Sequence, residues 1–245
     1  MDVGASLTLG VYWTSGPMVG GDYIRWVGSY MKILAELDEL FSPLYIVPNA
    51  SEKGVGILSE GVDFDAAIIS GLNHDIAYVG PDGKSSDFTV QSTSKLGFYS
   101  LLSTTPISDA STVTISVDAG AGLPNSTSRL VIDIPAGVLS ADKITQLFKL
   151  TVQFIKPRWA RVWDKALQAH PRQPVGNISI GWLTYFSDKS ISELLPGDVK
   201  VQVLDDGLIV QAADVPPTLN DQTCVNAILR IFNALEPSGV LKKKA

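Results

Sequence analysis

Hydrophobic positions along the chain follow two periods, one typical of strands and one typical of helices. Leu7, Leu9 and Val11 alternate with polar or small residues, which indicates a strand with one buried face. Apolar residues then recur at spacings of three and four from Tyr23 to Phe41, a helical pattern for which Asp22 is the expected N-cap. The chain therefore begins with a strand, a glycine-rich turn and an amphipathic helix.

Further short strands are predicted in the polar, glycine-rich stretch that follows. Residues 44–47 form a short apolar run, and residues 66–69 form another between turn signals. Residues 113–117 and 130–134 alternate at period two on either side of a glycine-rich loop. The last two segments predict neighbouring strands of a hairpin with a long connection.

The pattern returns to helical spacing after Ser140, which is the expected N-cap of a second amphipathic helix. Its apolar face runs from Ile144 to Ile155. Pro157 cannot continue the helix, and the spacing of apolar residues across 159–166 predicts that the helix restarts there after a kink.

The C-terminal part predicts strands first and a helix last. Residues 178–186 read as one strand, and residues 199–203 and 208–211 form a hairpin around the turn Asp205-Asp206-Gly207. A third amphipathic helix begins near Asn220 and carries its apolar residues to Leu235.

These elements predict an α+β fold, with a mixed, mostly antiparallel sheet packed against about three amphipathic helices. Strands and helices do not alternate regularly, as a parallel sheet would require. We expect one domain over residues 1–245. Because a strand, turn and helix recur along the chain, two similar halves, 1–110 and 111–245, are an alternative organisation.

Composition narrows the class of protein. At 45% hydrophobic residues the chain can build a core without a metal or a disulfide, and its single cysteine, Cys224, excludes an intramolecular disulfide. The N-terminal segment carries Asp2 where a secretory signal has positive charge, and no run of eighteen apolar residues occurs. A cytoplasmic protein without membrane association is expected.

The net charge of −6 disfavours direct binding of nucleic acid, because neutralising phosphates needs a surplus of basic residues. The charge is unevenly distributed. Residues 59–87 hold six acids against one lysine, whereas residues 142–172 hold seven bases against two acids. Solvated loops explain such a cluster simply, and steering of a basic partner is the functional alternative. The acidic cluster supplies our candidate partner-binding residues: Asp63, Asp65, Asp75, Asp82 and Asp87.

Two partial motifs, one for nucleotide binding and one for acyl transfer, each lack an essential residue or companion motif. Gly16 and Gly21 have the glycine spacing of a phosphate loop, but Asp22 follows where lysine is needed and would repel phosphate. Ser140 and Lys143 match the serine–lysine spacing of penicillin-recognising acylases without the companion lysine-threonine-glycine motif. A helix cap explains Ser140 without chemistry.

Catalytic groups for hydrolysis are sparse. His74 and His170 are the only imidazoles, no glycine-x-serine-x-glycine turn exists, and Cys224 fits a small core position. Two pairs of carboxylates occur: Asp63 and Asp65, expected on one side of a strand, and Asp205 and Asp206, expected on a turn. Either pair could in principle act as an acid and a base or bind a cation, but two carboxylates by themselves do not indicate such a site. We therefore expect no catalytic residues, no cofactor and no metal.

The most distinctive segment spans residues 175–187. Its core, Gly181-Trp182-Leu183-Thr184-Tyr185, resembles a motif of bacterial immunity proteins linked to type VI secretion and polymorphic toxins. The N-terminal strand, the aromatic first helix with Trp26 and the chain length resemble the immunity protein 52 family. A related type VI immunity family shares a similar motif. Along a strand, Trp182 and Thr184 would share one face and Leu183 and Tyr185 the other. We expect the motif residues to be buried and structural, with direct contact to a partner as the alternative.

The resemblance implies a non-enzymatic antitoxin that binds and blocks a cognate protein toxin. For this family the toxin is a restriction-endonuclease-like DNase, whose phosphate-binding surface is basic and would suit an acidic inhibitor. Homodimerisation is left open. The alternatives are a small hydrolase that uses His74 or His170, and an adaptor protein of a secretion system.

Overall fold

The computed structural model describes residues 6–47, 53–57, 62–72, 78–123, 126–164, 178–217 and 222–242. The chain divides into two compact units. Unit 1 comprises residues 1–12 and 133–245, and unit 2 comprises residues 13–132. The prediction of one domain, and the alternative of two similar halves, stay predictions, and each unit is described by itself.

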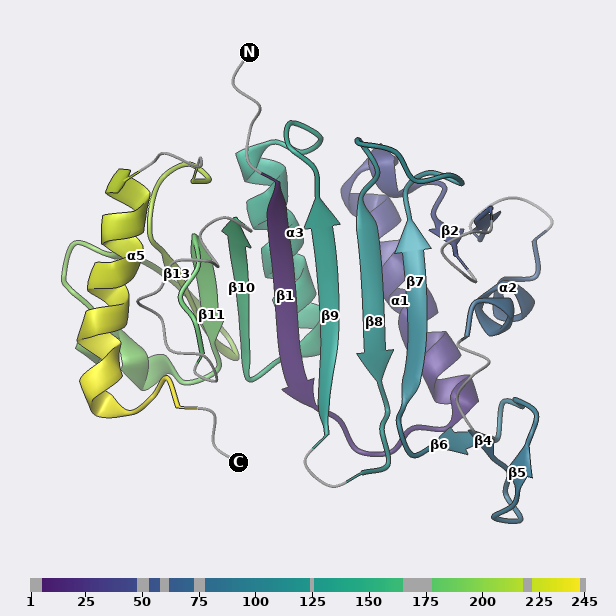
Figure 1. Ribbon diagram of the computed structural model, residues 1–245. Coiled ribbons are helices and arrows are strands. Elements are labelled where there is room, and N and C mark those ends of the chain that lie inside the picture. The colour runs from purple at the N-terminus through teal and green to yellow at the C-terminus, as the bar shows by residue number, and fades with distance from the viewer. Residues whose placement is uncertain are drawn as a thin grey trace. The chain divides into compact units, whose positions relative to one another are not determined.

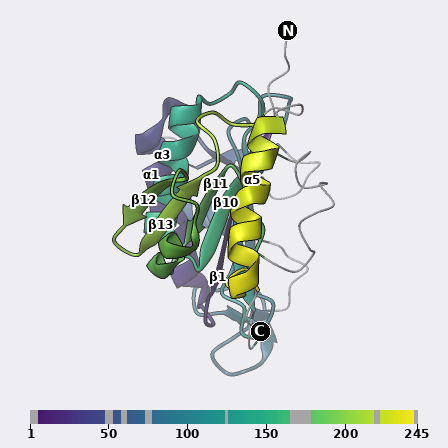
Figure 2. The ribbon, with the colours of Figure 1, turned by 90° about the vertical axis from the view of Figure 1, so that its left-hand side faces the viewer.

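The described residues of unit 1 form five strands in the order β12, β13, β11, β10 and β1, and each neighbouring pair is antiparallel (Figures 1 and 2). The strand bounds are as follows: β1 (Leu7–Thr14, the last two residues of which belong to unit 2), β10 (Trp159–Asp164), β11 (Leu183–Phe186), β12 (Lys200–Leu204) and β13 (Gly207–Gln211).

Helices cover both faces of the unit 1 strands. Figure 2 shows α3 (Ala141–Ile155) and α5 (Gln222–Leu235) on opposite sides of β10 and β11. On the α5 side, Trp159, Phe186 and Leu208 form a buried cluster with apolar residues of the helix. The other helical elements in the described part of this unit are two short 3-10 helices, η2 (Lys189–Leu194) and η3 (Glu236–Ser238).

Unit 2 holds strands in the order β9, β8, β7, β2 and β3, together with a small sheet in the order β5, β4 and β6. Strand bounds are β2 (Tyr45–Ile46), β3 (Val55–Gly56), β4 (Tyr78–Val79), β5 (Ser85–Ser86), β6 (Thr93–Ser94), β7 (Phe98–Ser103), β8 (Thr114–Ala119) and β9 (Thr127–Ile134). Its helical elements are α1 (Gly20–Leu37), η1 (Glu39–Phe41) and α2 (Phe64–Ser70).

Helix α1 is the main packing element of unit 2. The ring of Tyr23 lies 5.2 Å from that of Phe98 on β7, and its hydroxyl donates a 2.9 Å hydrogen bond to Ser100. Burial raises the pKa of Tyr23 far above its usual value, so the phenol stays neutral. Phe64 of α2 packs against Gly28 of α1, where a side chain would collide with the ring. The position of α2 is thereby tied to α1.

The predicted fold class is confirmed: a large antiparallel sheet is packed with helices. The three long helices α1, α3 and α5, the strands β1 and β2, the neighbouring strands β8 and β9, and the β12–β13 hairpin all lie where the hydrophobic pattern predicts them. Ser140 is the N-cap of α3, and its hydroxyl accepts a 3.3 Å hydrogen bond from the amide of Lys143. Among the described helices, none is long and apolar enough to cross a membrane.

The prediction that Asp22 caps α1 is wrong. Val19 occupies the N-cap position without a side-chain hydrogen bond, and Asp22 lies in the first turn, paired with Arg25. The first amides of the helix are satisfied by distant backbone instead, since Gly20 and Gly21 donate 2.8 Å hydrogen bonds to the carbonyls of Ser92 and Val90. Tertiary contacts thus replace the local cap.

Two segment predictions in the second half also need correction. Residues 159–164 of the predicted restarted helix form the strand β10, and residues 165–166 lie outside the described residues. The helix α3 ends at Ile155, and the left-handed backbone of its C-cap Lys156 (φ 52°) turns the chain before Pro157. Of the predicted strand 178–186, the part in regular pairing is β11.

Candidate functional site

Asp63 and Asp65 belong to a helix, which corrects the prediction that they share one side of a strand. The carboxylate of Asp63 accepts a 3.2 Å hydrogen bond from the amide of Ala66 and is the N-cap of α2, and Asp65 lies in the first turn. Negative charge at both positions suits the positive end of the helix dipole. Both side chains are exposed.

Asp82 and Asp87 flank the β5 side of the small sheet. The carboxylate of Asp82 accepts a 3.1 Å hydrogen bond from the amide of Lys84, and the ammonium of Lys84 lies 3.9 Å away. Both aspartates are exposed. Asp75, the fifth candidate, lies outside the described residues.

The structure thus places four of the five acids in unit 2, two on α2 and two beside the β4–β5 hairpin (Figure 1). Within the described part of the chain, Asp63, Asp65 and Asp87 take part in no ion pair. Among the described residues, they join no group of three or more His, Cys, Asp or Glu side chains that could hold a metal ion. What they share is exposed, uncompensated negative charge.

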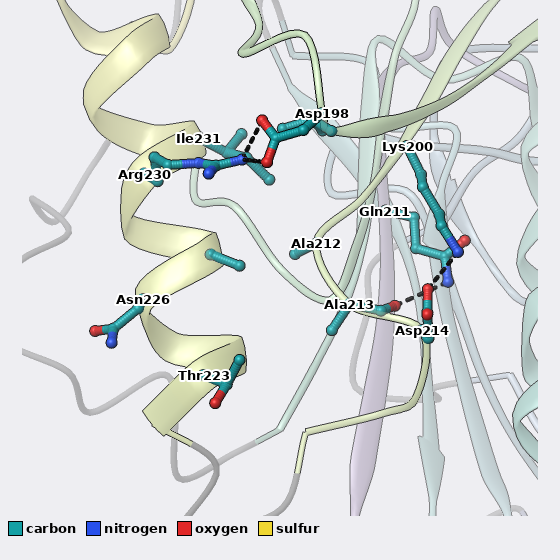
Figure 3. Close-up of a pocket in the computed structure, with 12 residues that line it drawn as sticks. Asp198, Lys200, Gln211, Ala212, Ala213, Asp214, Thr223, Asn226, Arg230 and Ile231 are labelled. Carbon is teal, nitrogen blue, oxygen red and sulfur yellow. Dashed lines mark hydrogen bonds and ion pairs between the residues drawn. The ribbon is translucent and has the colours of Figure 1, made fainter.

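A groove in unit 1 was not predicted from the sequence. It lies between α5 and the ends of β12 and β13, and its volume is about 500 Å³ (Figure 3). Its lining consists of Asp198, Val199, Lys200, Gln211, Ala212, Ala213, Asp214, Thr223, Asn226, Ala227, Arg230 and Ile231. The lining comes from three separate segments of the sequence, 198–200, 211–214 and 223–231, so no single local motif predicts it.

Two ion pairs neutralise the charges of this groove. One guanidinium nitrogen of Arg230 lies 2.6 Å from each carboxylate oxygen of Asp198, and the ammonium of Lys200 contacts Asp214. Figure 3 shows Arg230 reaching from α5 to Asp198. The lining includes neither histidine nor cysteine, and both of its carboxylates are paired. Among the described lining residues, none is an imidazole or an unpaired carboxylate that could act as a general base.

The pairing of Asp198 with Arg230 predicts a measurable titration. Hydrogen bonding from Arg230 lowers the pKa of Asp198 below its ordinary value of 3.8, so any stabilisation by the pair is present above that value and lost as the pH falls through the lowered pKa. In an Arg230→Met variant, the pKa of Asp198 should rise toward 3.8. Carboxyl-carbon NMR titration measures this, and an unchanged pKa would contradict the pairing.

The motif Gly181-Trp182-Leu183-Thr184-Tyr185 lies inside unit 1. Every one of these residues is buried. The indole nitrogen of Trp182 donates a 2.8 Å hydrogen bond to the carbonyl of Ala213, and the hydroxyl of Tyr185 donates a 2.7 Å bond to the carbonyl of Asp206. The motif thereby anchors β11 to the segments at both ends of β13.

Other chemistry has little basis in the described residues. Cys224 is fully buried in the α5 cluster, as expected for a small core residue. Over the described ranges, no group of three or more His, Cys, Asp or Glu side chains is arranged to hold a metal ion. His74 and His170 lie outside those ranges, so the hydrolase alternative stays untested.

The fold and these surfaces define a mixed α+β protein with an exposed acidic region in unit 2 and a self-neutralised groove in unit 1. The fold is similar to that of a type VI secretion system (T6SS) protein of Pseudomonas aeruginosa, with a TM-score of 0.57 and 12% sequence identity over 98% of this chain and 77% of the other. No family profile matches the sequence. No curated protein sequence matches it either.

Proposed function

We propose that this chain is a type VI secretion-associated immunity protein, which binds and neutralises a cognate toxin without catalysing a reaction. The similarity of the fold to a T6SS protein supports the association with that system. The resemblance of residues 181–185 to the immunity-protein motif supports the assignment as an antitoxin. The toxin that best fits the acidic chain is a basic nuclease effector.

The observation that carries the proposal is the exposure of Asp63, Asp65 and Asp87 outside any described ion pair. A nuclease surface that binds phosphate is positively charged, and exposed carboxylates of opposite sign accelerate encounter and fix orientation. Such carboxylates act through their field and need no convergence. Their distribution over α2 and the hairpin therefore fits partner binding better than chemistry.

Neutralising the described acids should weaken toxin binding without unfolding the protein. The variant combines Asp63→Asn, Asp65→Asn, Asp82→Asn and Asp87→Asn. Asparagine caps a helix as well as aspartate does, so α2 keeps its N-cap while four charges are lost. Association with the candidate toxin encoded beside this chain should slow by roughly ten-fold or more at low salt, because electrostatic steering is lost. Stopped-flow or biosensor kinetics over a salt series measures the effect.

The matched control removes four exposed acids of unit 1 by Asp188→Asn, Glu193→Gln, Asp205→Asn and Glu236→Gln. It has the same net charge as the test variant and should keep most of the association rate. Equal slowing in both variants would show that only net charge matters. Unchanged kinetics in the test variant would refute the assignment of these acids.

The hydrolase and the adaptor alternatives each predict a result that differs from that of an immunity protein in cells exposed to the toxin. A hydrolase should lose its protective effect when His74 and His170 are replaced by glutamine, whereas an immunity protein should retain it. An adaptor of the secretion apparatus should associate with its partner without protecting cells from the toxin. Protection that survives both histidine substitutions, together with a stable complex, supports the antitoxin.

A further inference from the structure

Strand β12 is an uncovered sheet edge. Among the described strands it is the terminal one of unit 1 and pairs with β13 alone, and Figure 2 looks onto this side of the unit. Residues 200–203 are exposed, among them Val201 at 37% and Val203 at 64%. Exposed valines on an edge strand are a template for pairing with another strand. Charged residues often protect such edges, but here Lys200 is held by Asp214.

The register of the hairpin decides which backbone groups face outward. The two-residue turn Asp205-Asp206 joins Leu204 to its partner Gly207, and a hairpin of this loop length is closed by a hydrogen-bonded pair. Hydrogen-bonded and non-hydrogen-bonded pairs then alternate along the strand. The amides and carbonyls of Val201 and Val203 therefore point away from β13. Free backbone groups and exposed apolar side chains belong to the same two residues.

This edge is complementary to itself. In an antiparallel pairing with a two-fold axis at Gln202, Val201 of one copy faces Val203 of the other, and the reverse pair forms by symmetry. Each valine pair exchanges two backbone hydrogen bonds, so all eight outward groups of the two copies are satisfied. The valine side chains also cover one another.

The charges at the ends of this pairing are compensated. The same register brings Asp198 opposite Asp206 of the second copy. Asp198 is paired with Arg230, and Asp206 lies 3.1 Å from the ammonium of Lys156. Two neutral ion pairs therefore meet at each end in place of two bare carboxylates. Asp205, which is exposed and has no ion pair among the described residues, would face Val199, so one uncompensated carboxylate and not a facing pair of them lies at each end.

We propose that a second copy of this chain docks on β12, forming a two-fold symmetric dimer through antiparallel pairing of residues 200–204 about Gln202. The self-complementary register and the compensated charges favour this occupant over a strand of another protein. The contact is short, so the dimer is weak and depends on concentration. The proposal does not depend on toxin binding.

A cysteine at the symmetry axis tests the register. In a non-hydrogen-bonded antiparallel pair the Cα atoms lie about 4.5 Å apart, within the range that a disulfide spans. Gln202→Cys should therefore form an intermolecular disulfide under mild oxidation. Lys200→Cys, on the same face of the same strand, is the control: its two copies would be separated by four residues along the strand, roughly 13 Å, and should not crosslink.

Sedimentation velocity over a concentration series tests the association without crosslinking. The unmodified chain should show a monomer–dimer equilibrium, and Val203→Lys should weaken it by about ten-fold, because two cross-strand valine pairs are lost. Val215→Lys, at a residue 59% exposed outside β12, should leave the equilibrium unchanged. A chain that remains monomeric at the highest attainable concentration, or equal crosslinking of the two cysteine variants, would overturn the proposal and leave the edge to a foreign strand.

Discussion

Replacing Trp182 by alanine should lower the free energy of unfolding by about 3–5 kcal/mol, the usual cost of deleting a large aromatic side chain from a core. The residue is 1% exposed, and its indole nitrogen is bonded to the carbonyl of Ala213. Its backbone is held as well, because its amide donates to Val162 and its carbonyl accepts from Ala212, each within 2.9 Å. The surrounding strands cannot easily collapse into the cavity. Urea or guanidinium denaturation followed by circular dichroism measures the loss.

Trp182→Phe separates the two contributions of the indole. Phenylalanine keeps most of the apolar contact and removes the hydrogen bond, so the loss should be smaller, about 1–2 kcal/mol. A stability for Trp182→Ala within about 0.5 kcal/mol of the parent, the range of ordinary surface changes, would show that Trp182 is not a core residue. In that case direct contact of the motif with a partner would become the better interpretation.

Burial of this motif bears on where a partner binds. Since Trp182, Leu183 and Tyr185 are each 1% exposed, they have almost no surface to offer a toxin. These residues therefore contribute to the core of unit 1. Under the proposed function, specificity for the partner would come from exposed residues such as those on α2 and the β4–β5 hairpin.

Elements with strong local signals were predictable from the sequence. The Asp205-Asp206-Gly207 turn between two alternating segments identified the β12–β13 hairpin, because the turn residues set both its position and its register. Ser140 identified the start of α3 in the same way, since its hydroxyl satisfies an otherwise unpaired amide. Here the interaction that stabilises the element is encoded within a few residues.

Strand β10 was mistaken for a helix because it is buried on both faces. All six residues from Trp159 to Asp164 are buried, so polar and apolar positions do not alternate. Its apolar residues are spaced by three and four, which imitates a helix. Even Arg161 is covered, with its guanidinium 4.0 Å from the ring centre of Trp163. Only the antiparallel partners β1 and β11, distant in sequence, determine the extended conformation.

The sequence pattern does not predict helix α2, because the helix is short. Four apolar residues in a row at 66–69 fit a buried strand as well as a helical turn. The cap by Asp63 and the packing of Phe64 against α1 decide in favour of the helix. The groove beside α5 was beyond sequence reasoning altogether, since Asp198 and Arg230 are 32 residues apart.

Gly181→Ala should be nearly as damaging as the loss of Trp182, although it adds only one methyl group. A Cβ atom at Gly181 would lie 2.2 Å from the carbonyl oxygen of Val162, far inside van der Waals contact. Neither side can yield easily, because Val162 belongs to β10 between β1 and β11, and the amide of Gly181 is bonded to the hydroxyl of Thr184. The expected loss is about 3 kcal/mol, at the upper end of overpacking costs.

Gly197→Ala is the matched control for this substitution. A Cβ at Gly197 meets no atom within 4 Å, and its backbone is outside the left-handed region, so its stability should change by less than about 0.5 kcal/mol. Thermal and chemical denaturation of the two variants compares a crowded glycine with an open one. Equal stability would mean that β10 can move away from residue 181. The close contact between Gly181 and Val162 would then not reflect tight packing of the motif against β10.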